Sequence, residues 1–487
     1  MLPDSVRSRL GAYYTPPALS ARLLDLATEA GTDWTRCRVL DPACGGGAFL
    51  GPAALRIAQH LGAKSPETIL ASVEQRLRGF EIDPFAAWLS QIFLEVALAR
   101  PITAAGRPLA KLVSVCDALQ LEPKGKAYDL VVGNPPYGRI GLSASTRERY
   151  KRSLYGHANL YGVFTDLALR WTVPGGVIAY VTPTSFLAGE YFKALRSLLA
   201  AEAPPVAIDF IEARKGVFED VLQETMLAAY RLGRPAKKTA VHHLSVSSEG
   251  TAKVTRAGHF HVPAGSTSAP WLMPRSQGHS QVIEALTRMR SRLADWGYKV
   301  STGPLVWNRH KNQLRNRPGK DTLPLVWAEA IAGPGQFVFR AKKKNHEPFF
   351  KMEVGDNWLK IDRPCVLLQR TTAKEQSRRL IAAALPQDLI SEYGGVVVEN
   401  HLNMIRPLNG EPCVSPAALA AVLNSEIVDL AFRCISGSVA VSAFELEALP
   451  LPSPSEMKSI ESLLGRASHA ETIERRLRMI YLGEGRA

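Results

Sequence analysis

Short apolar runs rich in β-branched residues alternate with longer helical patterns through the first half of the chain. Strands that alternate with helices in this way are typical of a mainly parallel α/β sheet. The runs predict seven strands, at residues 38–40, 77–82, 112–116, 130–132, 177–181, 206–211 and 225–231. The intervening patterns predict helices at residues 17–30, 48–61, 85–99, 160–172 and 190–201.

The pattern weakens between about residue 233 and residue 280, where Ser, Thr, Gly, Pro and Lys replace the regular apolar positions. Such a stretch is typical of a linker or an irregular connection. The length of 487 residues also exceeds one typical domain. We therefore expect a first domain over residues 1–240 and a second over residues 241–487.

Charge is distributed unevenly along the chain. Residues 1–235 hold 26 Lys and Arg against 22 Asp and Glu, whereas the remaining residues hold 33 against 23. The formal charge of +14 therefore resides mainly in the second part, where an anionic partner such as DNA or RNA is expected. Positive charge that serves only solubility explains the same composition equally well.

Neither a membrane segment nor a metal site is indicated by the composition. Asp4, Arg7 and Arg9 interrupt the N-terminal segment, and no apolar stretch is long enough to span a bilayer. The six cysteines contain no Cys-x-x-Cys pair, so neither zinc nor a disulfide framework is supported. We expect a soluble, cytoplasmic protein with reduced thiols and no bound metal.

The expected strand at residues 130–132 is followed closely by Asn134, Pro135, Pro136 and Tyr137. Two prolines end a strand and hold a rigid loop, because neither can donate to the sheet. The Asn134 amide oxygen and a neighbouring carbonyl can accept from an exocyclic amine, and the Tyr137 ring suits the face of a heterocycle. For this motif alone, an ordinary strand-ending turn is an equal alternative.

A glycine-rich turn follows the first expected strand, in the order Asp41-Pro42-Ala43-Cys44-Gly45-Gly46-Gly47. Such a turn lets a ligand approach bare backbone beside a helix N-terminus at the carboxyl edge of a sheet. Asp41 would repel a pyrophosphate and attract an ammonium group, which favours the amino-acid end of S-adenosylmethionine over NAD. A plain tight turn is the alternative.

Carboxylates close the next two expected strands. Glu81 ends the second strand, where the hydroxyls of a nucleotide ribose would need an acceptor. Asp117 ends the third strand and can accept from an adenine amino group. Each acid alone is better interpreted as a solvated cap. A glycine turn, Glu, Asp and Asn-Pro-Pro-Tyr at four successive strand ends argue against coincidence.

The order of these motifs resembles that of the gamma group of DNA amino-methyltransferases, the TaqI-like adenine-N6 enzymes of restriction–modification systems. In that group an N-terminal cofactor segment, here residues 11–17, precedes the other motifs, and a target-recognition domain follows them. Weaker matches lie at residues 368–372, 398–403, 423–425, 435–438 and 446–452. The resemblance implies an α/β fold: a seven-stranded Rossmann-like class I S-adenosylmethionine-dependent methyltransferase domain, then a mixed α+β target-recognition domain.

The resemblance also implies the site residues. The cofactor pocket would be lined by Tyr13, Tyr14, Thr15, Asp41, Ala43, Cys44, Gly45, Glu81, Ile82, Asp117, Ala118 and Asn134. The catalytic pocket would contain Asn134, Pro135, Pro136, Tyr137 and, less closely matched, Phe218.

These pockets predict transfer of the methyl group to the N6 amine of adenine in double-stranded DNA. The Asn134 oxygen and the Pro135 carbonyl would accept both amine hydrogens, which drives the nitrogen toward tetrahedral geometry. A base inside a duplex cannot reach such a pocket, so it must be flipped out, with Tyr137 and Phe218 stacking on it.

Basic residues in two regions are expected to hold the DNA. The first group follows the catalytic loop and comprises Arg139, Arg147, Arg149, Lys151 and Arg152. The second lies in the recognition domain and comprises Arg309, Lys311, Arg315, Arg317, Lys342, Lys343 and Lys344. For the first group a solvated face is an equal alternative. The sequence leaves open whether a separate restriction endonuclease acts on the same site.

Other functions use the same amine chemistry. Asn-Pro-Pro-Tyr also occurs in protein glutamine and RNA guanine methyltransferases, which usually lack a large basic C-terminal domain. Cytosine-N4 enzymes more often have Ser or Thr in place of Asn134. A non-catalytic DNA specificity subunit with an inactive methylase fold is a further alternative, against which the complete set of motifs argues.

Overall fold

The chain forms two compact units in the computed structural model. The first contains residues 1–271 and 275–277, and the second contains residues 272–274 and 278–487. The structure describes residues 15–123, 127–212, 224–235, 238–247, 250–263, 268–371, 378–436, 440–466 and 469–483.

The first unit is built on a nine-stranded mixed sheet with the spatial order β11-β10-β8-β9-β7-β4-β1-β2-β3. Its strands are β1 (Val39–Asp41), β2 (Leu77–Glu81), β3 (Val113–Val115), β4 (Tyr128–Gly133), β7 (Thr172–Pro183), β8 (Pro205–Ile211), β9 (Thr225–Arg231), β10 (Thr239–Val246) and β11 (Ala252–Phe260). The five strands from β3 to β7 in this order run parallel, and β9 runs antiparallel between β7 and β8. The seven predicted strands are confirmed, and the carboxyl ends of β1, β2, β3 and β4 meet at one edge.

Strands β10 and β11 lie where the sequence predicts a linker, so that prediction is wrong for these residues. β10 pairs in parallel with β8 and antiparallel with β11. Their signal is weak because two histidines interrupt the apolar positions of β10, and β11 is largely exposed. The first unit continues to Trp271, and the expected domain boundary at residue 240 falls inside β10.

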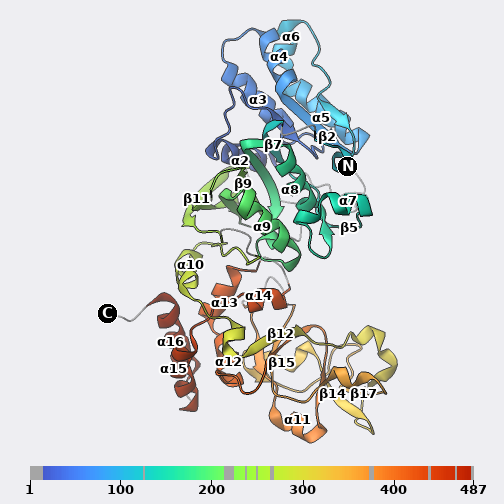
Figure 1. Cartoon of the computed structure of the whole chain (residues 1–487), viewed down its shortest axis with the longest axis vertical. Coiled ribbons are helices and arrows are strands. Elements are labelled where there is room, and N and C mark those ends of the chain that lie inside the picture. The colour runs from blue at the N-terminus through green and yellow to red at the C-terminus, as the bar shows by residue number, and fades with distance from the viewer. Residues whose placement is uncertain are drawn as a thin grey trace. The chain divides into compact units, whose positions relative to one another are not determined.

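Helices cover the sheet of the first unit, and α3 packs against α4 and α5 (Figure 1). The helices are α2 (Pro17–Glu29), α3 (Leu50–Leu61), α4 (Pro66–Arg76), α5 (Pro84–Ala97), α6 (Ala99–Ala105), α7 (Ala144–Arg149), α8 (Leu160–Trp171) and α9 (Lys193–Glu202). Helices α4, α6 and α7 were not predicted, and the predicted helix at residues 190–201 begins with a 3-10 turn at Glu190–Phe192. A separate two-stranded ladder joins β5 (Arg139–Ile140) to β6 (Ala158–Asn159).

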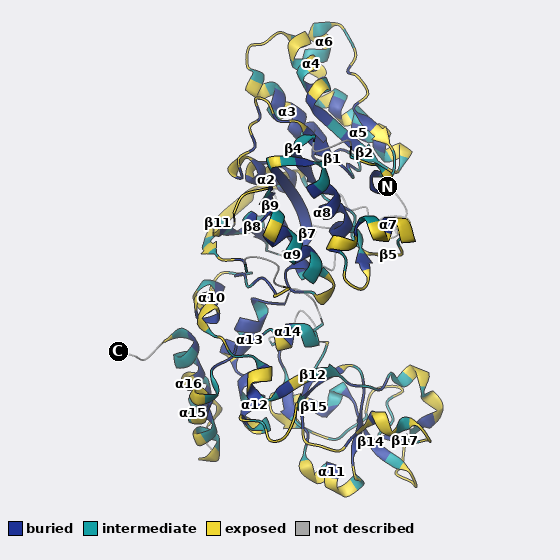
Figure 2. Cartoon of the chain, in the orientation of Figure 1, coloured by how far each residue is buried: buried dark blue, intermediate teal, exposed yellow. Residues whose placement is uncertain are grey.

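The core of the first unit lies between the sheet and its helices (Figure 2). Leu23 of α2, Ile57 of α3 and Val39, Leu130 and Val132 of the central strands are fully buried. Burial of each such side chain contributes about 1.5–3 kcal/mol. This packing holds the central strands, and therefore their carboxyl ends, in fixed positions.

The second unit contains two main sheets and a group of helices. The four-stranded sheet has the order β12 (Tyr298–Thr302), β22 (Leu402–Pro407), β19 (Val366–Gln369) and β20 (Ala382–Ala384). The five-stranded sheet has the order β13 (Leu314–Arg315), β17 (Phe349–Lys351), β14 (Thr322–Val326), β21 (Val396–Val398) and β18 (Lys360–Ile361). A further ladder joins β15 (Ile331–Gly333) and β16 (Gln336–Phe337). The helices are α10 (His279–Arg288), α11 (Gln387–Tyr393), α12 (Pro416–Leu423), α13 (Glu426–Arg433), α14 (Ala443–Glu447), α15 (Pro454–Gly465) and α16 (Ala470–Leu482).

Within the described ranges, no single helix combines the length and the apolar character that a bilayer crossing requires. Helices α5 and α6 meet the length and composition test only when they are taken together, and they are bent by 71° relative to each other.

Candidate active site

The glycine turn and the end of β2 are tied together by the Glu81 carboxylate. Its Oε2 accepts from the Gly45 N–H at 2.8 Å, and its Oε1 accepts from the Asp83 N–H at 2.9 Å. Gly45 and Gly47 have φ angles of +52° and +90°, which glycine adopts without strain. The structure therefore brings two of the predicted strand ends into direct contact.

Asp41 is an almost completely buried acid at the end of β1, with 1% of its surface exposed. Its Oδ1 accepts from the Ala43 N–H at 3.1 Å, while its Oδ2 has no hydrogen-bond partner among the described residues. Burial, together with the nearby Glu81, raises the pKa of Asp41 to about 8. A buried acceptor without a partner is unfavourable, so this position favours a ligand that brings a positively charged donor.

Gly133, the last residue of β4, allows β4 to approach Asp41 closely. A Cβ atom at position 133 would lie 2.7 Å from Asp41 Oδ1, which is too close for any carbon. The next residue in the chain is Asn134, so this close approach places the buried acid directly beside the start of the Asn-Pro-Pro-Tyr loop.

The Asn134 side chain is held on both sides. Its Nδ2 donates to Thr15 Oγ1 at 3.1 Å, and its Oδ1 accepts from the Tyr137 hydroxyl at 2.6 Å. That hydroxyl also lies 3.3 Å from the carbonyl oxygen of Val181 on β7. These contacts fix which way the amide points, and Oδ1 keeps a second lone pair for another donor.

The other predicted residues of this edge occupy less specific positions. Asp117 Oδ1 accepts from the Leu119 N–H at 3.0 Å, the capping role that the sequence allows as an alternative. The Cys44 side chain is buried, and burial raises the pKa of its thiol, so only its backbone is suited to contact a ligand. Ile82 is 58% exposed and offers an apolar surface, whereas Ala118 is buried. Tyr13, Tyr14 and Phe218 lie outside the described residues.

Three of the five basic residues after the catalytic loop are engaged by carboxylates. Arg149 pairs with Glu122 at 2.6 Å, Lys151 with Glu148 at 2.5 Å, and Arg152 with Asp166 at 2.6 Å. Arg147 donates to the Gly156 carbonyl oxygen at 2.6 Å. Among these five residues only Arg139 has a side chain with neither a hydrogen bond nor an ion pair to the part of the chain that the structure describes.

In the second unit, Lys342, Lys343 and Lys344 lie on an exposed loop whose position depends on Glu329. Glu329 Oε1 accepts from the Lys342 and Lys343 N–H groups at 3.0 and 3.2 Å, and it lies 2.7 Å from His346 Nδ1. The His346 ring stacks on the Trp327 ring with centroids 3.8 Å apart. Burial raises the pKa of Glu329, but these donors outweigh it and hold the pKa below its ordinary value.

The remaining basic candidates of the second unit have weaker anchors. Arg315 donates to the carbonyl oxygens of Asn312 and Leu314, both at 2.7 Å, which keeps its guanidinium near its own backbone. The Lys311 Nζ lies 5.8 Å from the centroid of the Trp307 ring. Arg309 and Arg317 are exposed.

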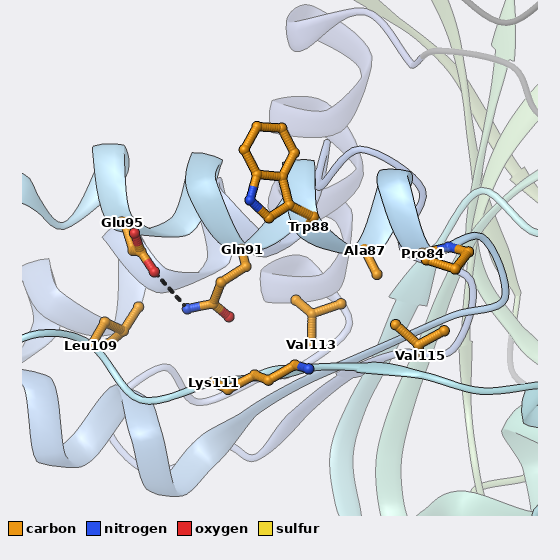
Figure 3. A pocket seen from close by; sticks show the side chains of 9 residues that line it. All are labelled: Pro84, Ala87, Trp88, Gln91, Glu95, Leu109, Lys111, Val113 and Val115. Atoms are coloured by element: carbon orange, nitrogen blue, oxygen red, sulfur yellow. Dashed lines mark hydrogen bonds between the residues drawn. The ribbon is translucent and has the colours of Figure 1, made fainter.

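A pocket of about 300 Å³ lies along the edge strand β3 (Figure 3). It is lined by Pro84, Ala87, Trp88, Gln91, Glu95, Leu109, Lys111, Val113 and Val115. Gln91 Nε2 donates to Glu95 Oε1 at 3.1 Å along its wall. None of the predicted site residues lines this pocket, so we assign the candidate site to the strand ends.

Gly133 and Glu329 are not among the site residues that the sequence predicts, although Gly133 allows the close approach of β4 to Asp41 and Glu329 holds the basic loop. A glycine at the end of an otherwise β-branched strand is a detectable signal of close backbone approach. Glu329 lies outside any recognisable motif, and its contacts with the basic loop require the fold.

A mixed α/β sheet that carries a glycine turn, acidic strand ends and Asn-Pro-Pro-Tyr at one edge defines a class of protein. The class is that of the S-adenosylmethionine-dependent methyltransferases. Asp41 Oδ2, which is buried and has no partner among the described residues, fits a ligand with an ammonium group, and the left-handed glycines let a ligand approach the backbone of the turn.

Comparisons with known proteins narrow this class. Residues 78–218 match the family model of the Eco57I restriction-modification methylase. The chain is 26% identical over 460 residues to the type II methyltransferase M.BsuBI of Bacillus subtilis, covering 92% of this chain and 88% of that one. It is 26% identical over 478 residues to M.PstI of Providencia stuartii, covering 94% and 90%. Over 213 residues it is 35% identical to M.TthHB8I of Thermus thermophilus, covering 41% of each.

Among solved structures, the type IIL restriction-modification enzyme MmeI in complex with DNA matches with a TM-score of 0.56. At 13% identity the match covers 99% of this chain and 78% of that one and supports the fold alone. Together the comparisons show that the chain is similar over most of its length to type II methyltransferases, and the methyltransferase fold and site imply S-adenosylmethionine as cofactor.

Proposed function

We propose that the chain methylates the N6 amine of an adenine in double-stranded DNA, as a member of the gamma, TaqI-like group. One observation carries this proposal: the Asn134 amide is oriented by Thr15 and Tyr137 at the sheet edge that also holds Asp41 and Glu81. An amide fixed in this way is suited to recognise and activate a planar amine.

The first unit would hold the cofactor. Asp41 Oδ2 would accept from its ammonium group, and the free lone pairs of Glu81 would accept from its ribose hydroxyls. Ile82 and Asp117 would contact its adenine. S-adenosylmethionine bound there would supply an electrophilic sulfonium methyl group, and transfer of this group to the amine nitrogen would break the carbon–sulfur bond and leave its electron pair on sulfur.

Asn134 makes the amine a better nucleophile in this proposal. Its Oδ1 has one acceptor position left beside the Tyr137 hydroxyl, and the Pro135 carbonyl supplies the second acceptor. Hydrogen bonds to both amine hydrogens withdraw the nitrogen lone pair from the ring and direct it at the methyl carbon. The amine proton then leaves to solvent, and no covalent enzyme intermediate is needed.

The target base would reach this pocket by flipping out of the duplex, with Tyr137 replacing part of its lost stacking. Stacking on an aromatic side chain contributes about 1–3 kcal/mol per base. The second unit, with its basic loop at Lys342, Lys343 and Lys344, would provide target recognition. A separate restriction endonuclease for the same site is a further expectation of this function.

Expression in a methylation-deficient host, followed by sequencing that maps modified bases, tests the proposal. We expect N6-methyladenine at one recurrent DNA sequence, and none with Asn134→Ala. Methylcytosine at the recurrent site would reassign the substrate base. Labelled methyl groups in RNA or protein, with unmodified DNA, would overturn the proposal, and so would failure of the purified chain to bind S-adenosylmethionine.

A further inference from the structure

Aromatic and basic side chains, most of them exposed, gather around Arg139, which follows the Asn134 loop in the chain. This group, which we call the Tyr191 cluster, comprises Arg139, Tyr155, His157, Tyr191 and Lys193. The Arg139 Cζ lies 5.5 Å from the Tyr191 ring centroid, and the His157 ring lies 5.4 Å from the same centroid. Tyr155 and Tyr191 are 42% and 41% exposed, so the cluster faces solvent.

Two connections join the Tyr191 cluster to the catalytic loop. Arg139 is only two residues beyond Tyr137, which limits the separation of their Cα atoms to about 7 Å. The Tyr137 ring contacts the Tyr161 ring edge to face at 6.0 Å, and Tyr161 stacks on Phe192 at 4.8 Å. Phe192 is the chain neighbour of Tyr191. The cluster and the proposed base pocket therefore belong to one packed structure.

The position of the Tyr191 ring is specified by Gly156. Gly156 has a φ angle of +62°, and a Cβ atom there would lie 2.9 Å from two carbon atoms of the Tyr191 ring. Arg147 donates to the Gly156 carbonyl oxygen and holds this turn in place. A ring seated against bare backbone provides a fixed platform for the Arg139 side chain.

The Arg139 guanidinium, unlike the charged groups of its basic neighbours, is available to bind an anion. Arg149, Lys151 and Arg152 each pair with a carboxylate, and Lys193 lies 3.6 Å from Glu190. Arg139 is exposed and forms no ion pair within the described ranges. A guanidinium over an aromatic face keeps its N–H donors free, and it loses little conformational freedom when it binds a phosphate.

We propose that Arg139 binds a backbone phosphate next to the flipped nucleotide, and that Tyr191 is the positioning residue that holds the guanidinium ready. The proposal rests on the proposed function, since it requires a DNA strand at the Asn134 loop. It assigns the Tyr191 ring to orientation of the guanidinium, and it separates Arg139 from Arg149, Lys151 and Arg152, whose side chains are paired with carboxylates.

Binding of the full chain to a duplex that contains the mapped methylation site, measured over a range of salt concentrations without methyl donor, tests this inference. Loss of one phosphate contact reduces the slope of log affinity against log salt by about 0.9. We expect this reduction for Arg139→Ala and for Tyr191→Leu, with the wild-type slope restored in Tyr191→Phe. Arg100→Ala removes an exposed arginine of α6 and serves as the matched control with an unchanged slope.

Duplexes with a single uncharged methylphosphonate locate the contact. A neutral linkage next to the target base should weaken wild-type binding and leave the affinity of Arg139→Ala unchanged. Equal losses for both proteins at every position would overturn the inference, and so would a wild-type salt slope in Arg139→Ala. If the wild-type chain binds no DNA, the proposed function fails. If it binds DNA and Arg139→Ala binds in the same way, only the inference about Arg139 fails.

Discussion

The two units of the chain present their candidate functional groups in different ways. In the first unit Asp41 and Glu81 end two strands of one sheet, Asn134 directly follows a third, and the three residues gather at one edge. In the second unit the candidate Lys342, Lys343 and Lys344 lie on a single loop that one carboxylate, Glu329, holds through local contacts. Parallel strands bring distant parts of the sequence together through backbone pairing, whereas a displayed loop depends on a few polar side chains.

The largest effect is expected from removal of the Asn134 amide, which tests whether the sheet edge of the first unit is the catalytic centre. Asn134→Ala should lower the rate of methyl transfer by about 10²–10³-fold, the usual cost of losing one oriented acceptor or donor in an active site. Tyr137→Phe should cost less, because it removes the hydroxyl at 2.6 Å but keeps the ring and the amide. Single-turnover rates measure both. Full activity in Asn134→Ala would exclude the sheet edge that holds Asp41, Glu81 and Asn134 as the catalytic centre.

A second test asks whether the edge needs the close approach of β4 to β1. Gly133→Ala places a carbon 2.7 Å from Asp41 Oδ1 and should lower the free energy of unfolding by about 1–3 kcal/mol, the typical cost of overpacking. The control is Gly141→Ala, where an added Cβ meets no atom within 4 Å and the effect should be within about 0.5 kcal/mol. Denaturant unfolding compares them. Equal stabilities would show that the strands separate easily at this point.

The acid at this edge should make cofactor binding depend on pH. The pKa of Asp41 is about 8 against an ordinary 3.8, so the ligand-free protein retains a proton that the unfolded chain loses above about pH 4. Asp41 therefore stabilises the ligand-free fold at low pH, and this contribution is lost as the pH rises toward 8. An ammonium ligand requires the ionised acid, so affinity should rise with pH by at most about tenfold per unit.

Calorimetric titration with S-adenosylmethionine between about pH 6 and 7.5 measures this dependence, because the α-amino group of the ligand is still largely protonated there. Asp41→Asn keeps the acceptor for the Ala43 N–H and should bind more weakly but with a flat pH profile. A slope in Asp41→Asn equal to that of the wild type would assign the titration to another group.

The same comparison explains how much the sequence could predict. The strands of the first unit are predictable because buried β-branched runs such as residues 130–132 are a clear strand signal. Their alternation with helices indicates parallel pairing, which brings their carboxyl ends to one edge. β10 was missed because His242 and His243 break its apolar pattern, and its pairing with β8 depends on tertiary contacts.

Within the sites, the sequence indicates which residue types are present, but it does not indicate which partners their side chains contact. The sequence offers Arg139 and Arg152 as equivalent cations, but Arg152 finds Asp166 and Glu202, residues 14 and 50 positions away, while Arg139 lies over Tyr191. In the second unit the three lysines are evident, whereas the role of Glu329 depends on a hydrogen-bond geometry that no local pattern encodes.

The smallest expected effect concerns the loop that Glu329 holds. Glu329→Gln removes the charge that accepts from the Lys342 and Lys343 N–H groups and from His346, and a hydrogen bond to a charged group contributes about 1.5–3 kcal/mol. The loop should lose most of this stabilisation and become less ordered. DNA affinity should fall by only about fivefold, because the lysines remain on the chain. Hydrogen exchange at residues 342–346 and binding titrations measure the two effects.

Glu353→Gln, which changes an exposed acid of the same unit, is the control for charge alone. If both variants bind DNA equally while exchange rises only in Glu329→Gln, the loop is ordered by Glu329 but does not contact DNA, and the basic surface of the second unit must be sought elsewhere.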